Sequence, residues 1–138
     1  MKAFGAKGDG RTDDSRALQQ ALDALPARGG KLKFDKGQYL ISKGLVLEGK
    51  KQFEIEGTGA SLLARAGLPK LGENSLFTIR NCENFRIEGL VLDGNRANRP
   101  VMANQVPCHN LRLLDIRYAN FINLTSSNAM QDGFTLRG

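Results

Sequence analysis

The chain has 138 residues, and its 20 Lys and Arg against 14 Asp and Glu give a formal net charge of +6. This length and a hydrophobic content of 41% indicate one domain with a buried core and exclude a disordered tail. Glycine is abundant, at 16 residues, which indicates many turns and short strands. No apolar run is long enough for a membrane span, and the N-terminus has no apolar secretory core.

The first quarter of the chain contains the single predicted helix. Thr12–Ser15 supplies side-chain oxygens that can accept hydrogen bonds from the first N–H groups of a helix. Apolar residues then recur at helical spacing, at Ala17, Leu18, Ala21, Leu22 and Leu25. Because Pro26 and Gly29-Gly30 end this pattern, residues 1–30 are predicted to form a cap segment and helix.

From residue 31 to residue 138 the apolar pattern alternates and repeats itself. Gln52–Gly57 matches Asn84–Gly89 at an offset of 32 residues, and Asn81–Leu90 matches Pro107–Ile116 at an offset of 26. A further match, of Phe77–Asn81 to Phe134–Gly138, has an offset of 57, or about two repeats. A repeat of this length with short alternating strands and no helix is typical of a parallel β-solenoid.

The repeats predict which residues lie above one another in successive coils. One inner stack is expected to consist of Phe53, Phe85 and Leu111. An amide ladder at a turn is expected from Gln52, Asn84 and Asn110. Cys82 and Cys108 become neighbours, and two reduced thiols are favoured over a disulfide, which the spacing also permits. The helix is expected to cover the first coil, where it shields an open strand edge.

The opening run Phe4–Ser15 resembles the N-terminus of the pectate-lyase-like superfamily, in which an FGAxGDGxxDD segment and a capping helix precede the coils. Leu90–Arg96 resembles an LxLDGN segment frequent in its members. The resemblance implies an all-β fold, a right-handed parallel β-helix (solenoid) with one N-terminal capping α-helix. Because Gly138 falls inside a coil, residues 1–138 are expected to be the N-terminal part of such a domain and to be incomplete at the C-terminus.

The family includes polygalacturonases, pectate lyases, polyuronate epimerases and phage tailspike depolymerases. The resemblance therefore implies a carbohydrate-active protein that acts on an acidic polysaccharide, as a lyase, an epimerase or a glycoside hydrolase. It also implies a secreted or virion-associated location. The alternative is a non-catalytic polysaccharide-binding or tailspike-like assembly module whose open end docks onto another chain. Self-association or stacking through the open C-terminal coil is also expected. The basic residues are scattered and lack interleaved aromatic residues, so no nucleic-acid partner is expected.

Asp93 and Asp132 are the candidate catalytic residues. Glycoside hydrolysis uses paired carboxylates, whereas uronate lyases and epimerases need a base together with cations that stabilise the enolate. Cations near these two residues in sequence are the candidate substrate-binding residues, namely Arg96, Arg99 and Arg137. The alternative is that both aspartates serve turns beside glycine. No complete catalytic motif of the family can be carried over to this chain.

Other motifs favour structural roles. The glycine-rich loop Gly5–Gly10 fits neither a Walker loop nor a dinucleotide fingerprint, and glycines with positive φ explain it better. Helix capping is favoured over calcium binding for Asp9, Asp13 and Asp14. His109 is favoured as a turn or surface residue over a general base. No metal site is predicted from the residues, and Ca²⁺ is implied by the family resemblance alone.

Overall fold

The computed structural model describes residues 2–66, 75–98, 109–129 and 134–137. The strands are β1 (Asp9–Asp13), β2 (Lys31–Lys33), β3 (Gly37–Ile41), β4 (Leu45–Glu48), β5 (Glu54–Glu56), β6 (Ala60–Ala64), β7 (Ser75–Arg80), β8 (Glu83–Glu88), β9 (Val91–Asp93), β10 (His109–Leu114), β11 (Arg117–Ile122), β12 (Thr125–Ser127) and β13 (Phe134–Arg137). The helical elements are η1 (Lys2–Phe4), α1 (Ser15–Asp23) and η3 (Arg96–Asn98).

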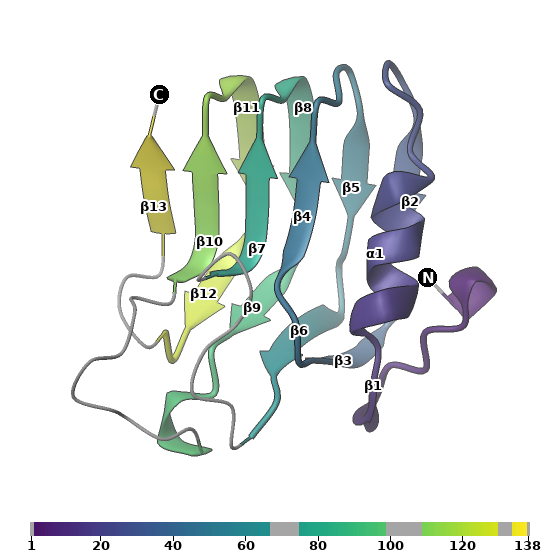
Figure 1. Cartoon of the computed structure of the whole chain (residues 1–138), viewed down its shortest axis with the longest axis vertical. Coiled ribbons are helices and arrows are strands. Elements are labelled where there is room, and N and C mark those ends of the chain that lie inside the picture. The colour runs from purple at the N-terminus through teal and green to yellow at the C-terminus, as the bar shows by residue number, and fades with distance from the viewer. Residues whose placement is uncertain (1, 67–74, 99–108, 130–133, 138) are drawn as a thin grey trace.

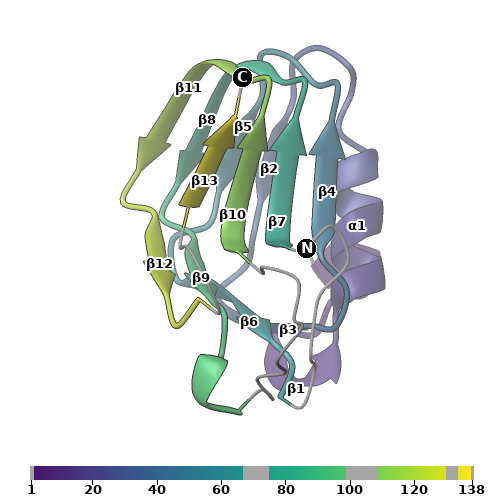
Figure 2. The same cartoon turned by 60° about the vertical axis from the view of Figure 1, so that its left-hand side comes forward.

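The strands form three parallel sheets that wind around one core, as Figures 1 and 2 show. The sheet orders are β1-β3-β6-β9-β12, β4-β7-β10-β13 and β2-β5-β8-β11, so each turn of the chain adds one strand to each sheet. Inward-facing residues from all three sheets form a single hydrophobic cluster. The predicted β-solenoid with one capping helix is therefore confirmed.

The apolar stripe of the predicted helix is confirmed, since Leu18, Ala21, Leu22 and Leu25 are all buried. The capping prediction is confirmed only for Asp13, whose Oδ1 accepts a hydrogen bond from the Ser15 N–H at 3.1 Å. It is wrong for the other two aspartates, because the opening loop folds back and its own N–H groups require acceptors.

Asp14 is the residue before the helix, yet its carboxylate accepts hydrogen bonds from the backbone N–H groups of Lys7 at 2.8 Å and Gly8 at 2.9 Å. Asp9 closes its own turn, and the N–H groups of Thr12 and Arg11 lower its pKa to about 2. The carboxylates of the opening motif therefore fix the loop that leads into the helix.

The repeat offset of 32 residues is confirmed. Ile55 pairs with Ile87 across β5 and β8, and the rings of Phe53 and Phe85 stack with centroids 4.9 Å apart and planes 2° apart. The offset of 57 is also confirmed, because Leu111 of β10 pairs with Phe77 on one side and with Phe134 on the other.

The offset of 26 is wrong. It aligned β8 with β10, which lie in different sheets, whereas the residue that pairs with Phe85 is Ala119. Leu111 therefore stacks on Phe77 and does not continue the stack of Phe53 and Phe85. The error has a physical cause, since every strand around the coil alternates inward apolar with outward polar residues and so resembles its neighbours.

The predicted amide ladder is wrong as well. Gln52 and Asn84 occupy equivalent positions of successive coils with φ of 54° and 53°, but the third member is Tyr118, with φ of 54°. Asn110 is buried instead, and its Nδ2 donates hydrogen bonds to the backbone oxygens of Leu92 at 3.0 Å and Ser127 at 2.7 Å. The equivalent positions thus share a left-handed backbone, which asparagine tolerates better than most residues.

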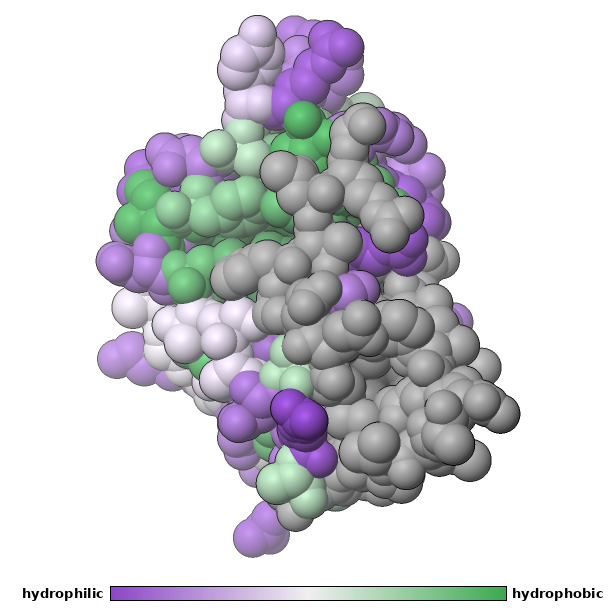
Figure 3. Space-filling model, turned by 90° about the vertical axis from the view of Figure 1, so that its left-hand side faces the viewer, coloured by the Kyte–Doolittle hydropathy of each residue, from purple (hydrophilic) through white to green (hydrophobic). Residues whose placement is uncertain are grey.

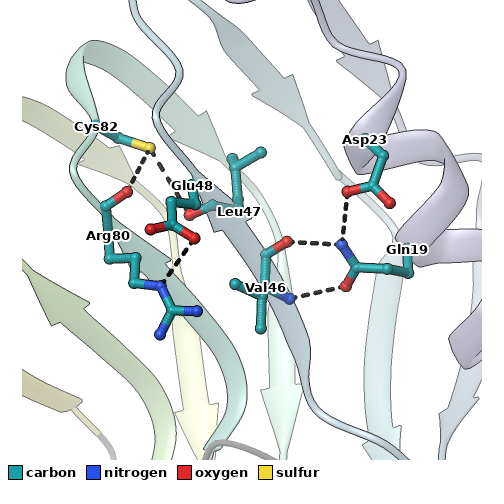
Figure 4. A network of polar contacts seen from close by, with 7 residues as sticks. All are labelled: Gln19, Asp23, Val46, Leu47, Glu48, Arg80 and Cys82. Atoms are coloured by element: carbon teal, nitrogen blue, oxygen red, sulfur yellow. Dashed lines mark hydrogen bonds and ion pairs between the residues drawn. The ribbon is translucent and has the colours of Figure 1, made fainter.

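The helix α1 covers the exposed edge of β4, as predicted. The Gln19 Nε2 donates to the Val46 backbone oxygen at 2.8 Å, and the Val46 N–H donates to Gln19 Oε1 at 2.9 Å (Figure 4). One side-chain amide therefore makes the two hydrogen bonds that a neighbouring strand would otherwise supply. Gln19 Nε2 also donates to Asp23 Oδ1 at 2.9 Å, which holds the amide in this orientation.

The last coil, made of β11, β12 and β13, forms the opposite end of the described solenoid. Apolar side chains are visible over this end in Figure 3. Tyr118 is 78% exposed, and Phe121 and Leu124 are partly buried against the core. The predicted self-association through this coil stays a prediction.

We expect Gln19→Ala to lower the free energy of unfolding by about 1–2 kcal/mol, because two backbone groups of Val46 lose their partners. The control is Gln20→Ala, which changes an exposed neighbour on the same helix and removes no side-chain hydrogen bond seen in the described residues. Urea unfolding of both variants measures the difference. Equal losses would show that the amide does not protect the edge of β4.

We expect Phe85→Ala to lower the free energy of unfolding by about 3–5 kcal/mol, because it removes a buried ring from the stack with Phe53. The aromatic control is Tyr118→Ala, whose loss should stay within about 0.5 kcal/mol because its ring is exposed. Urea unfolding is again the measurement, and a large effect at Tyr118 would contradict this picture of the core.

Candidate functional site

Asp93 lies at the carboxyl end of β9, where the chain leaves one sheet and later enters another as β10. Its half-buried carboxylate accepts two hydrogen bonds through Oδ1, from the Asn95 N–H at 2.8 Å and from the Asn128 Nδ2 at 3.1 Å. Asp93 therefore closes a turn within its own coil and braces the next coil, which is the structural role considered above.

The other candidates are only partly described. Arg96 is exposed in η3, and no ion pair joins it to Asp93 within the described ranges. Asp132 and Arg99 lie outside the described residues. Arg137 is the last residue of β13, and its backbone pairs with Leu114 of β10. The structure thus places one of the two candidate carboxylates, and the proposed catalytic pair stays a prediction.

The sheet β4-β7-β10-β13 carries arginines that sequence reasoning missed. The strand register places Glu48, Arg80, Leu114 and Arg137 in one row across neighbouring strands. The adjacent row consists of Val46, Thr78, Arg112 and Thr135. Arg80 and Arg112 are half-buried and alternate with the core residues of their strands, so they point away from the core.

Arg80 also contacts Glu48 of the preceding coil, with 3.2 Å between Nε and Oε2 (Figure 4). The sequence could have identified this residue, because the match of Phe77–Asn81 to Phe134–Gly138 aligns Arg80 with the candidate Arg137. The same signal was lost for Arg112, because the offset of 26 aligned it with Arg86, which belongs to another sheet.

Thr78 occupies the centre of this sheet face. It is fully buried, and its Oγ1 has no hydrogen-bond partner within the described part of the chain. An unused buried hydroxyl costs about 1–3 kcal/mol. The described residues therefore leave hydrogen-bonding capacity unused beside Arg112.

Cys82 is buried at the corner between β7 and β8. Its thiol donates to the backbone oxygen of Arg80 at 3.3 Å and lies 3.8 Å from that of Leu47 (Figure 4). Burial raises the pKa of the Cys82 thiol, which favours an inert, protonated side chain. Cys82 is a free thiol, and Cys108 lies outside the described residues. That the two reduced thiols are neighbours therefore stays a prediction, although the offset of 26 on which it rested is wrong.

Within residues 2–66, 75–98, 109–129 and 134–137, no three His, Cys, Asp or Glu side chains are placed to hold a metal ion. The Ca²⁺ that the family resemblance implies therefore finds no matching set of carboxylates among these residues. His109 begins β10 as a half-buried residue that pairs with Ser75. In the same ranges, no helix is long and apolar enough to cross a membrane.

The glycine-rich opening loop has the structural role that was favoured. Gly5, Gly8 and Gly10 have φ of 93°, 62° and 70°, values that L side chains adopt rarely.

The fold and this face define a class of protein, a parallel β-helix with a helical cap at one end and arginines on one sheet. The family model described as "Rhamnogalacturonase A/epimerase, pectate lyase-like" matches residues 1–106. The chain belongs to this family.

Its relatives include the mannuronan C5-epimerase AlgE3 of Azotobacter vinelandii, which is 34% identical over 109 residues and is matched by 71% of this chain. The capsule KN3-specific depolymerase 1 of Klebsiella phage KN3-1 is 45% identical over 73 residues, or 46% of this chain. The matches span only 6% and 9% of those two proteins. The solved structure of ORF18 from Geobacillus virus E2 has a TM-score of 0.78 at 20% identity, over 96% of this chain and 26% of that one, and shares the fold.

We expect Asp93→Ala to lower the free energy of unfolding by about 1–2 kcal/mol, since Asn95 and Asn128 lose their acceptor. Asp93→Asn retains a carbonyl oxygen and should cost less. Urea unfolding of the two variants compares the losses. Equal losses would show that the turn does not depend on the acceptor.

Proposed function

We propose that this chain forms the cap and coils of a β-helix protein that acts on an acidic polysaccharide, and that the outward face of β4-β7-β10-β13 binds the polysaccharide. The observation that carries the proposal is the presence of Arg80, Arg112 and Arg137 on neighbouring strands of one sheet. Guanidinium groups bind carboxylates through paired hydrogen bonds, so this face is suited to uronate residues.

The contrast with the sheet β2-β5-β8-β11 supports the choice of face. There ion pairs join successive coils, with Lys31 and Glu54 3.9 Å apart and Lys51 and Glu83 3.6 Å apart. These charges offset one another, whereas the paired rows of β4-β7-β10-β13 carry Arg80, Arg112 and Arg137 together with Glu48. A polyanion is therefore attracted more strongly to the arginine-bearing face.

The relatives support the substrate class. A mannuronan epimerase and a capsule depolymerase are both named for polysaccharides. In lyase and epimerase chemistry, cations beside the uronate carboxylate stabilise the charge that develops when the neighbouring proton is removed. We propose this role for the arginines and retain Asp93 and Asp132 as proposed catalytic residues, with Arg96, Arg99 and Arg137 as proposed substrate-binding residues. A secreted or virion-associated location is part of the proposal.

A non-catalytic polysaccharide-binding module is the second candidate. It is favoured by the hydrogen bonds of Asp93, which serve a turn and a neighbouring coil. Both candidates require binding to an acidic glycan, and only the first requires a chemical change in it.

The test begins with calorimetric titration of the protein with alginate and pectate, with a neutral glucan as control. We expect binding of the acidic glycans that weakens as salt is added, because screening reduces attraction between exposed charges. Arg112→Gln should weaken binding about fivefold, while Arg86→Gln, on the sheet β2-β5-β8-β11, should change it little because Arg86 is paired with Glu88. Equal binding of the neutral glucan, or equal effects of the two variants, would contradict the proposal.

Activity separates the two candidates. Absorbance of unsaturated sugar ends reports elimination, reducing ends report hydrolysis, and proton NMR of the polymer reports epimerisation. Retained binding without any of the three products would leave the non-catalytic module as the function of this chain.

A further inference from the structure

A cleft of about 790 Å³ lies between α1 and the start of β4. Its lining comes from two segments. One is the helix α1 together with Asp13, and the other is the turn from β3 into β4 with the start of β4. The polar side chains that line it are Asp13, Ser15, Arg16, Gln19, Gln20, Ser42 and Lys43. Its volume falls in the range of about 300–1,000 Å³ that is usual for small-ligand sites.

Two cations line this cleft, Arg16 from the helix and Lys43 from the turn. Both are exposed, and neither forms an ion pair with any residue that the structure describes. They approach the cleft from opposite sides, since one belongs to α1 and the other precedes β4. The cleft therefore offers two positive charges to an anionic group that enters it.

Asp13 is the one carboxylate in the lining, and its own neighbours satisfy it. The hydroxyl groups of Ser15 and Ser42 both donate hydrogen bonds to it. Partial burial disfavours its charged form, but these hydrogen bonds lower the pKa of Asp13 below its ordinary value. Ser15 in turn accepts the backbone N–H groups of Ser42 at 2.9 Å and Lys43 at 3.2 Å. This network ties the turn that carries Lys43 to the helix that carries Arg16.

Gln19 fixes the two walls of the cleft relative to each other. Its amide makes both hydrogen bonds to Val46 described above, so α1 cannot move away from β4 without breaking them. The backbone segments that carry Arg16 and Lys43 are thus fixed relative to each other before any ligand binds, which reduces the entropy that binding would otherwise cost.

The cleft continues the sheet face to which the proposed function assigns the polysaccharide. The helix lies beside β4, in the place where a preceding strand of β4-β7-β10-β13 would lie (Figure 1). Strands of a sheet are about 4.8 Å apart, which is close to the length of one sugar residue. A glycan that crosses the strands along the row of Arg80, clear of the buried Thr78, therefore reaches the cleft one strand beyond β4.

We propose that the cleft between α1 and β4 is a subsite for one acidic sugar residue, whose carboxylate binds between Arg16 and Lys43. This inference rests on the proposed function for its polysaccharide. It adds a binding position beyond the sheet, at the capped end of the solenoid, and so assigns a substrate-contacting role to the cap.

The experiment is calorimetric titration of the full chain with an oligouronate octasaccharide, which is long enough to cross the sheet and enter the cleft. The test variant combines Arg16→Gln with Lys43→Gln. Its matched control combines Arg28→Gln with Lys36→Gln, which removes the same charge from exposed cations that do not line the cleft. We expect the test variant to bind about tenfold more weakly and the control to stay within about twofold of the unchanged protein.

The outcomes separate this inference from the proposed function. Equal weakening in the two double variants would overturn the subsite, because it would show a general effect of charge. Unchanged binding in the test variant, together with weaker binding in Arg112→Gln, would overturn the subsite and leave the proposed function standing.

If the unchanged protein binds no octasaccharide, the proposed function fails, and NMR titration with glucuronate then tests the cleft alone. A shift of the Gly44 amide signal that is lost in the test variant would support the subsite. The absence of a shift would overturn it.

Discussion

Hydrogen bonding between parallel strands holds each coil in register with the next, and the positions of all other groups depend on that register. When Ile87 pairs with Ile55, Phe85 must stack on Phe53 in the core. Glu54 and Arg86, which lie between these residues in their strands, must then face solvent. A slip of one residue would exchange the core and the surface of a whole strand. The same constraint aligns surface residues from coil to coil, so charges distant in sequence become neighbours along the axis.

The sequence alone predicts the parts of this structure that depend on local patterns. The helical stripe from Leu18 to Leu25 and the stacking of Phe53 on Phe85 follow directly from apolar spacing. The offset of 26 between Asn84 and Asn110 gave a wrong alignment, because strands in different sheets of one coil share the same alternation of apolar and polar residues. The register at Leu111 depends on the long segment between β9 and β10, and no periodicity gives the length of that connection.

The candidate site shows the same division. Asp93 beside Gly94 reads as a turn residue, and its contacts with Asn95 and Asn128 agree with that interpretation. The sheet face with Arg80 and Arg112 could be recognised only after the sheets were known, since these residues belong to separate coils. The bond from the buried Asn110 to Leu92 was equally hidden, because it joins strands of two different sheets.

The amide of Gln19 closes the solenoid at the edge of β4. Because it occupies the edge of β4, no further strand can add beside Val46 without displacing the helix. Lengthening of the fold, by duplication of coils during evolution or by design, is therefore confined to positions that follow β4 in the chain. In this respect the molecule resembles a polymer with one blocked end, whose number of repeat units can change while its first unit stays the same.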